Sequence, residues 1–172
     1  NLKTIYGNCA STIYNLKSVN LNGLSKLTTI GLNFCSECRT LVDVNLNGLT
    51  GLETVGNYFC NSCSKLTNPN FDSWINVKTI GDYFCSTCVN ITSVNLSNVT
   101  NLISIGSNFF SGCIKVKDVD LSGLTSVTTI KSSFFASCNS LRSADISSLV
   151  NLTTISDSWF YSCNNLESLI VG

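Results

Sequence analysis

The sequence predicts a repeat solenoid, in which about seven rungs of 25 residues stack through parallel β-strands joined by short helical or 3-10 turns. Two observations predict this fold class. Apolar residues recur every 25 positions without insertion or deletion, and the same order of strand-like and turn-like segments returns in every interval. One such apolar column contains Leu2, Leu27, Leu52, Val77, Leu102, Val127 and Leu152.

The rung from Leu41 to Lys65 illustrates the expected elements. Val44, Asn45 and Leu46 alternate between apolar and polar, which is typical of a half-buried strand whose Val and Leu point inward. A second strand-like stretch, Leu52–Val55, ends at a glycine and is followed by FCxxC, whose apolar residues at i, i+1 and i+4 suit one helical turn. Each rung should therefore contain two short strands and a turn.

The rungs are expected to form one domain over residues 1–172. A single rung buries too little apolar surface to offset the conformational entropy of ordering its residues, so it cannot fold alone. Stacking buries both faces of each rung against its neighbours. The expected rungs lie near 16–40, 41–65, 66–90, 91–115, 116–140 and 141–165, with partial rungs at 1–15 and 166–172.

The repeated motif, LxxVxL followed by IGxxFFxxC, resembles the BspA-like or Treponema-type leucine-rich repeat, and the resemblance covers the whole chain. The segment Val116–Ser140 is especially similar to the 25-residue form of surface proteins. The resemblance implies a cell-surface or secreted protein that binds host, matrix or neighbouring-cell proteins. Three features depart from the pattern: Pro69 in the third strand, a first turn that reads YGNCAST, and Ile170 at the end of a column of Asn and Asp. Because Pro69 removes a backbone donor, we expect weakened strand pairing around it.

The composition excludes several classes of partner. Charged residues make up 12% of the chain, against about 25% in an average soluble domain, and ten basic side chains balance ten acidic ones. The chain therefore lacks the basic surface that nucleic-acid binding requires, and no apolar run is long enough to span a membrane. Its coat of Asn, Ser and Thr favours an extracellular or cell-surface location. The absence of Met indicates a stretch of a longer product.

The cysteines follow the same register. Cys35, Cys60 and Cys85 occupy the position that Phe takes in later rungs, which indicates a core site where thiols pack as small apolar groups. We expect the main column to be buried and mostly reduced, and Cys9 to be the strongest candidate for a free thiol. Disulfides are a less favoured alternative, as is zinc bound by CxxC pairs, because stacked sulfurs about 4.8 Å apart form a row and do not converge. No cofactor is therefore expected. The main column is Cys38, Cys63, Cys88, Cys113, Cys138 and Cys163.

Polar residues occupy the outward positions of the longer strand. In the column Asn20, Asn45, Asn70, Asn95, Asp120 and Asp145, stacked side chains can hydrogen-bond from rung to rung. The alternative is a ligand-facing surface made of Asp43, Asn45, Asn47, Asn68, Asn70, Asp72, Asn95, Asp118, Asp120 and Asp145. A calcium site at Asp118, Asp120 and Asp145 is a weaker third interpretation. Candidate glycosylation sequons lie at Asn90, Asn95, Asn98 and Asn151, a number that chance alone would give in so Asn-rich a chain.

The pattern predicts a binding protein and not an enzyme. The chain has no His, its carboxylates are scattered over the rungs, and no phosphate-binding loop or activated nucleophile is present. We expect a protein-binding or adhesion scaffold for a protein or glycan ligand at a cell surface. The alternative, favoured by the uniform outward columns, is a structural subunit that stacks end to end with copies of itself into a filament or coat. In either case the strand edge at Leu169, Ile170 and Val171 should be covered by a further rung or a neighbouring subunit.

Overall fold

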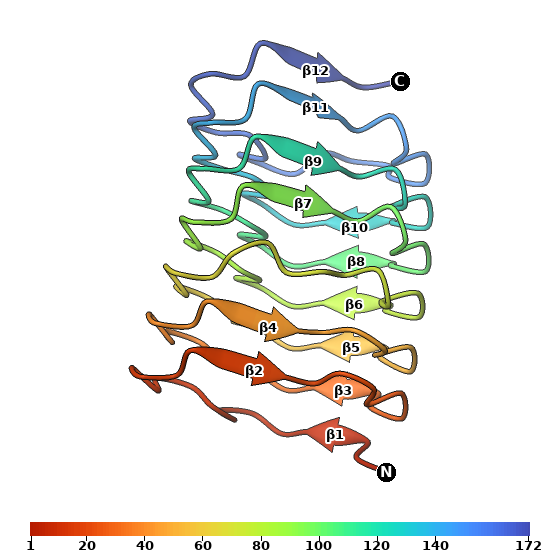
Figure 1. Ribbon diagram of the computed structural model, residues 1–172. Helices are drawn as coiled ribbons and strands as arrows, with labels where there is room; N and C mark the ends of the chain where they lie inside the picture. The colour runs from red at the N-terminus through yellow and green to blue at the C-terminus, as the bar shows by residue number, and fades with distance from the viewer.

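The computed structural model describes residues 1–172 and shows rungs of one outline stacked in register (Figure 1). The shorter strands form a six-stranded parallel sheet in which each residue pairs with its counterpart 25 positions along the chain, as Thr4 does with Thr29 and Thr29 with Thr54. This confirms the predicted leucine-rich repeat solenoid of about seven turns. The sheet consists of β1 (Thr4–Ile5), β3 (Thr29–Ile30), β5 (Thr54–Val55), β6 (Thr79–Ile80), β8 (Ser104–Ile105) and β10 (Thr129–Ile130).

The longer strands lie on the opposite face of the stack and pair only in twos. β2 pairs with β4, β7 with β9, and β11 with β12. Two interruptions separate these pairs: residues 66–71 form no strand, and β9 and β11 do not pair. The first interruption contains Pro69, so the expected loss of pairing there is confirmed. The strands are β2 (Ser18–Asn20), β4 (Asp43–Asn45), β7 (Ser93–Asn95), β9 (Asp118–Asp120), β11 (Ser143–Asp145) and β12 (Ser168–Ile170).

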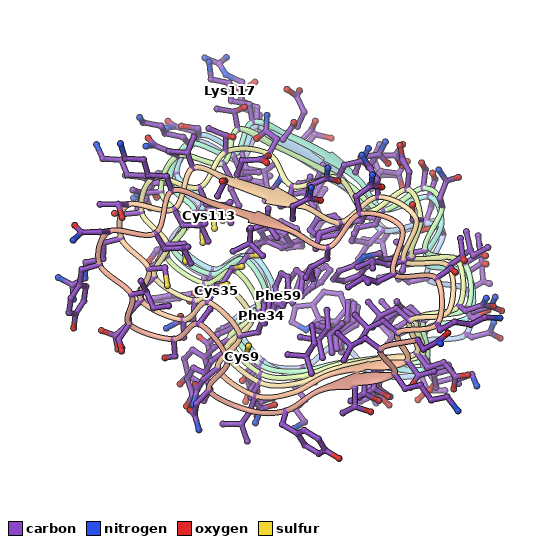
Figure 2. All side chains as sticks on the ribbon, turned by 60° about the horizontal axis from the view of Figure 1, so that its bottom comes forward. Cys9, Phe34, Cys35, Phe59, Cys113 and Lys117 are labelled. Carbon is purple, nitrogen blue, oxygen red and sulfur yellow. The ribbon has the colours of Figure 1, made fainter.

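One continuous hydrophobic core of 47 residues runs along the stack. Val44 and Leu46 are 3% and 1% exposed, which confirms the strand register expected from the sequence. The centre of the core is a column of stacked phenylalanine rings, whose first members, Phe34 and Phe59, lie inside the ring of backbone in Figure 2 with centroids 5.5 Å apart. The column continues through Phe84, Phe109 and Phe134 at 5.0, 5.2 and 5.3 Å. Equivalent side chains of adjacent rungs therefore pack directly on one another.

The turn after each shorter strand is not helical, so the expected helical or 3-10 turn is wrong. Asn33, Cys35 and Glu37 have φ values of 55°, 54° and 58°, in the left-handed region. The Asn33 N–H donates to the Asn57 carbonyl of the next rung (2.8 Å), whereas the Cys35 N–H donates to the Cys9 carbonyl of the previous rung (3.3 Å). Because these amides serve neighbouring rungs, they are not available for hydrogen bonds within a helical turn.

The column of six cysteines is buried, as predicted, and all ten cysteines are unpaired. Each buried thiol of the column donates to a carbonyl 28 residues earlier: Cys63 Sγ lies 2.9 Å from the Cys35 oxygen, and Cys88 Sγ lies 3.0 Å from that of Cys60. Burial raises the pKa of Cys38 to about 11 and that of Cys138 to about 12. Thiolate, the reactive form, is therefore scarce at neutral pH at these two positions.

Cys9 differs from the rest of the cysteines because it is exposed. It was expected to be the strongest candidate for a free thiol; all ten cysteines are free, and exposure is what sets Cys9 apart. No group of three or more His, Cys, Asp or Glu side chains is placed to hold a metal ion.

Substitutions at two adjacent strand positions test the register. Leu96 is 1% exposed, whereas Asn95 is exposed and its side chain accepts only the Ser97 N–H at 2.9 Å. Leu96→Asn should destabilise the protein by about 3 kcal/mol or more, because it buries an unpaired amide and removes core packing. Asn95→Ala should cost about 1 kcal/mol or less. Urea denaturation measures both, and equal losses would show that the strand is out of register by one residue.

Thiol labelling tests the burial of the cysteine column. With a colorimetric disulfide reagent at neutral pH, the native protein should release one rapid equivalent, from Cys9, while the unfolded protein should release ten. The matched control is Cys9→Ser, which should have no rapid equivalent. Rapid reaction of more than two thiols in the native protein would contradict the burial of the column.

Candidate ligand-binding face

The longer strands carry four of the five grooves on the surface of the protein. We call the surface formed by these strands, together with residues 66–72, the grooved face. All ten residues that the sequence suggested as ligand-facing line these grooves, and all are exposed except Asn45, which is half-buried. The grooves bring together, in turn, Asp43, Asn45, Asn47, Asn68 and Asn70; then Asn68, Asn70, Asp72 and Asn95; Asp118 by itself; and Asp120 with Asp145.

The grooves coincide with the two interruptions of strand pairing. At both interruptions a serine hydroxyl bridges to the rung below: Ser73 Oγ accepts the Gly48 N–H at 2.8 Å, and Ser148 Oγ donates to the Leu121 carbonyl at 2.8 Å. Where β2 and β4 pair, a backbone bond joins the same part of the rungs, between the Gly23 N–H and the Asn47 carbonyl at 2.9 Å. The serines therefore hold the rungs together at both interruptions. At the first one the Thr67 N–H still donates to the Val42 carbonyl and Asn68 Oδ1 accepts the Thr92 and Ser93 N–H groups, whereas between β9 and β11 the edge remains open.

The Asn and Asp column on the grooved face does not form the expected ladder between rungs. Each side-chain oxygen instead accepts the backbone N–H two residues later in its own rung, at 2.8–3.1 Å. Such a turn is the local hydrogen bond that Asn and Asp favour, and it directs the chain away from the strand. The column comprises Asn20, Asn45, Asn70, Asn95, Asp120 and Asp145. Its members therefore fix the shape of the grooves from within each rung.

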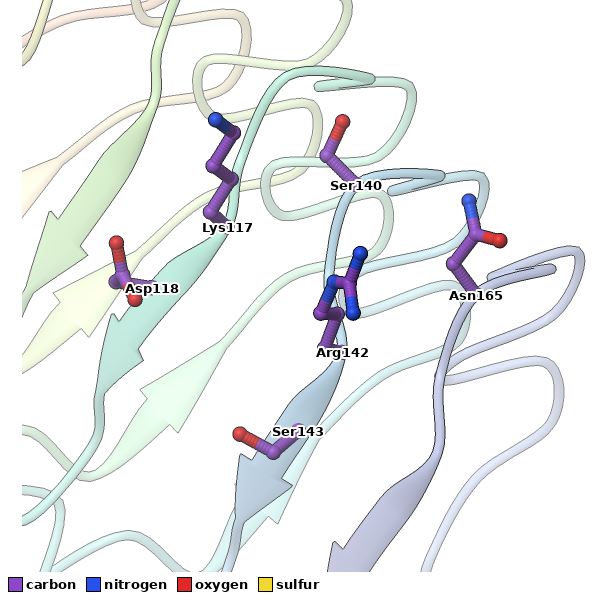
Figure 3. A pocket seen from close by; sticks show the side chains of 6 residues that line it. All are labelled: Lys117, Asp118, Ser140, Arg142, Ser143 and Asn165. Atoms are coloured by element: carbon purple, nitrogen blue, oxygen red, sulfur yellow. The ribbon is translucent and has the colours of Figure 1, made fainter.

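The largest groove lies between β9 and β11, and we call it the β9–β11 groove. It encloses about 570 Å³ and contains no hydrophobic residue. Figure 3 shows the Lys117 and Arg142 side chains extending to the same side, near Ser140 and Asn165 of the adjoining turns, with Asp118 and Ser143 on the two strands. Sequence reasoning identified only Asp118 among the six lining residues: Lys117, Asp118, Ser140, Arg142, Ser143 and Asn165.

Charged groups in this groove are largely free. The Lys117 ammonium and the Asp118 carboxylate have no hydrogen bond or ion pair within the protein. Arg142 Nη1 lies 3.4 Å from Glu167 Oε1, but both side chains are at least 70% exposed, so this pair is weak. The groove can therefore offer two cations and one carboxylate to a bound molecule.

Other predicted residues lie outside the grooves or at their margins. β12 pairs with β11 on one side only, and Leu169, Ile170 and Val171 are 46%, 50% and 61% exposed. Their coverage by another rung or subunit stays a prediction. Of the sequons, Asn95, Asn98 and Asn151 are exposed and Asn90 is half-buried. Their glycosylation also stays a prediction.

The sequence comparisons agree with this geometry. The family described as BspA type Leucine rich repeat region matches residues 1–67 and 53–172, with six copies of the repeat. The chain belongs to this family. BspA-type repeats thus extend over the whole of the described solenoid, which confirms the resemblance seen in the motif. No protein with a curated description is significantly similar.

Three solved structures of bacterial repeat proteins share the fold. A leucine rich cell surface protein of Faecalibacterium prausnitzii aligns with a TM-score of 0.76 at 21% identity, over 98% of this chain and 42% of that one. A leucine-rich repeat protein of T. pallidum gives 0.58 at 17%, over 81% and 72%, and one of Bacteroides ovatus gives 0.56 at 21%, over 97% and 52%. At these identities the likeness establishes the BspA-type fold alone. The structure has no helix long and apolar enough to cross a membrane.

The turn at Asp145 predicts a shifted titration. Hydrogen bonds from the Ser147 hydroxyl and then from the Ser147 N–H lower the pKa of Asp145 below its ordinary value of 3.8. Because the folded pKa is lowered, the turn stabilises the fold above that value and the contribution is lost as the pH falls through the folded pKa. A carboxyl titration by NMR should show a midpoint below 3.8. In Ser147→Ala the midpoint should move back toward 3.8, and a wild-type midpoint at or above 3.8 would contradict the assignment.

Proposed function

We propose that this protein is an extracellular or cell-surface scaffold that binds a protein or glycan ligand on its grooved face. The observation that carries the proposal is the coincidence of four grooves with one face and with the exposed polar residues of that face. Solenoids present extended surfaces of this kind to their ligands. The relative from F. prausnitzii, which is named a cell surface protein, supports the proposed location.

The opposite sheet is a poorer candidate. It pairs without interruption from β1 to β10, and its outward column is a row of Thr and Ser that lines no groove. A uniform sheet offers little that distinguishes one ligand from another. On the grooved face the Asn and Asp column is uniform, but the position held by Val42, Thr67, Lys117 and Arg142 changes from rung to rung. Variation between rungs favours recognition of a ligand over a purely structural filament.

Paired substitutions on the two faces test the proposal. Asn47 and Ser143 are exposed groove residues whose side chains form no hydrogen bonds, so an arginine at either position should block a groove without unfolding the chain. The control uses Thr54→Arg and Thr129→Arg, which make the same change of charge at exposed positions on the opposite sheet. Binding is measured by interferometry against a glycan array and purified extracellular-matrix proteins.

At least one ligand should bind the native protein and lose about tenfold or more in affinity with Asn47→Arg or Ser143→Arg, because about 1.4 kcal/mol of lost contact energy has that effect. The two control variants should retain the affinity. Absence of any ligand, or equal losses on the two faces, would overturn the proposal.

A further inference from the structure

We propose that the β9–β11 groove binds a carboxylated sugar residue of a glycan, with the carboxylate at Lys117 and Arg142 and the sugar hydroxyls at Asp118 and Ser143. This inference rests on the proposed function and specifies the ligand class of one groove. Its volume of about 570 Å³ falls within the range of about 300–1,000 Å³ that small-molecule sites occupy.

The backbone of this groove has hydrogen-bonding groups without partners. In the paired rungs on either side, the Lys117 N–H donates to the Thr92 carbonyl and the Glu167 N–H to the Arg142 carbonyl, both at 2.8 Å. Between them, no bond links the N–H groups of Arg142 or Ser143 to the Lys117 carbonyl. In the neighbouring rungs the equivalent N–H and carbonyl groups point toward each other across the space between the strands. Here the same groups point into the groove without a partner and can hydrogen-bond to a ligand.

The charges favour an anion at one end of the groove. Lys117 has no partner, and the exposed pair between Arg142 and Glu167 is weak enough for a ligand carboxylate to compete with it. A guanidinium binds a carboxylate through two parallel hydrogen bonds, and a nearby ammonium adds a third donor. The unpaired Arg142 N–H extends this group of donors.

The remaining residues favour a sugar over other anions. Asp118, with no partner of its own, can accept hydrogen bonds from sugar hydroxyls, and it would repel a doubly charged phosphate group more strongly than a single carboxylate. Ser140, Ser143 and Asn165 add neutral donors and acceptors. An acidic peptide would gain only charge contacts here, because no hydrophobic residue lines the groove to anchor its other side chains. A uronate-type sugar has a carboxylate for the cationic end of the groove and hydroxyls for its polar end.

The other interruption supplies an internal comparison. The groove beside β4 also lies at an interruption of strand pairing, and a serine also bridges its rungs. Val42 and Thr67 stand at the positions equivalent to Lys117 and Arg142, and there the Thr67 N–H donates to the Val42 carbonyl at 3.1 Å. The first interruption therefore has neither the cations nor the open backbone donor of the β9–β11 groove at these positions. The two cations of the β9–β11 groove are an addition that the fold does not require.

This comparison gives matched variants. Lys117→Val with Arg142→Thr converts the groove to the side chains of its counterpart, and both positions are exposed, so the fold should be retained. Val42→Lys with Thr67→Arg makes the reverse change. Binding is measured by isothermal titration calorimetry with tri-galacturonic acid as the probe. Its methyl ester, a sulfated heparin-type tetrasaccharide and hexaglutamate serve as alternative ligands, and circular dichroism confirms folding.

The native protein should bind tri-galacturonic acid at one site, about tenfold or more tightly than the methyl ester, with an affinity that falls as salt increases. The first variant should lose at least about tenfold, whereas the reverse variant, in which the backbone donor at position 67 is already bonded, should gain no second site of equal affinity. No binding by the native protein, equal binding by the first variant, a second site of equal affinity in the reverse variant, or tighter binding of the sulfated sugar or of hexaglutamate would each overturn the inference. If these tests fail but Asn47→Arg still lowers the affinity for a ligand, the proposed function is retained and only this inference is rejected.

Discussion

Every rung of this protein depends on hydrogen bonds that its neighbours supply. Of 87 backbone hydrogen bonds, only 11 lie within the regular strands, and many of the remaining 76 join turns of successive rungs. The turn amides alternate between the rung above and the rung below, and the buried thiols add a further bond to the rung before. Buried backbone polar groups must be hydrogen-bonded, and this alternation provides their partners. It therefore allows narrow rungs to enclose an apolar core.

The grooves of the grooved face form because backbone hydrogen bonds between neighbouring rungs are missing in two places. At residues 66–71 a proline removes a donor, and between β9 and β11 the strands separate while a serine keeps the rungs joined. Both interruptions occur at the solvent-exposed surface, where water can satisfy the released groups. The core beneath them stays continuous, since Val44, Ala144 and Ile146 remain buried. The strand pairing on one face can therefore be interrupted without weakening the packing beneath it.

The sequence predicted the repeat length, the inward positions and the core cysteines because each of these is a column of like residues, and Phe replaces Cys in register. The turn was predicted wrongly, because FCxxC has the same apolar spacing whether its amides bond within a helix or to neighbouring rungs. The Asn column was also ambiguous: Asn45 can reach a neighbour or the Asn47 N–H with equal ease. The ten polar residues were selected by their outward position. Lys117 and Arg142 were missed because the groove depends on the separation of β9 from β11, which the alternation of apolar and polar residues does not predict. One available signal was the replacement of Gly by Ser at 73 and 148.

The strict register between equivalent residues has a consequence for how such a protein can change over generations. If a segment of one rung is lost or duplicated, every residue stays in the column that it occupied before. This holds wherever the segment begins and ends. Phenylalanine still stacks on phenylalanine or cysteine on cysteine, and each new neighbour finds its hydrogen-bonding partners in place. Recombination between the similar stretches of its gene therefore has no favoured breakpoint within a rung. Related chains should differ in length by whole rungs far more readily than by single residues.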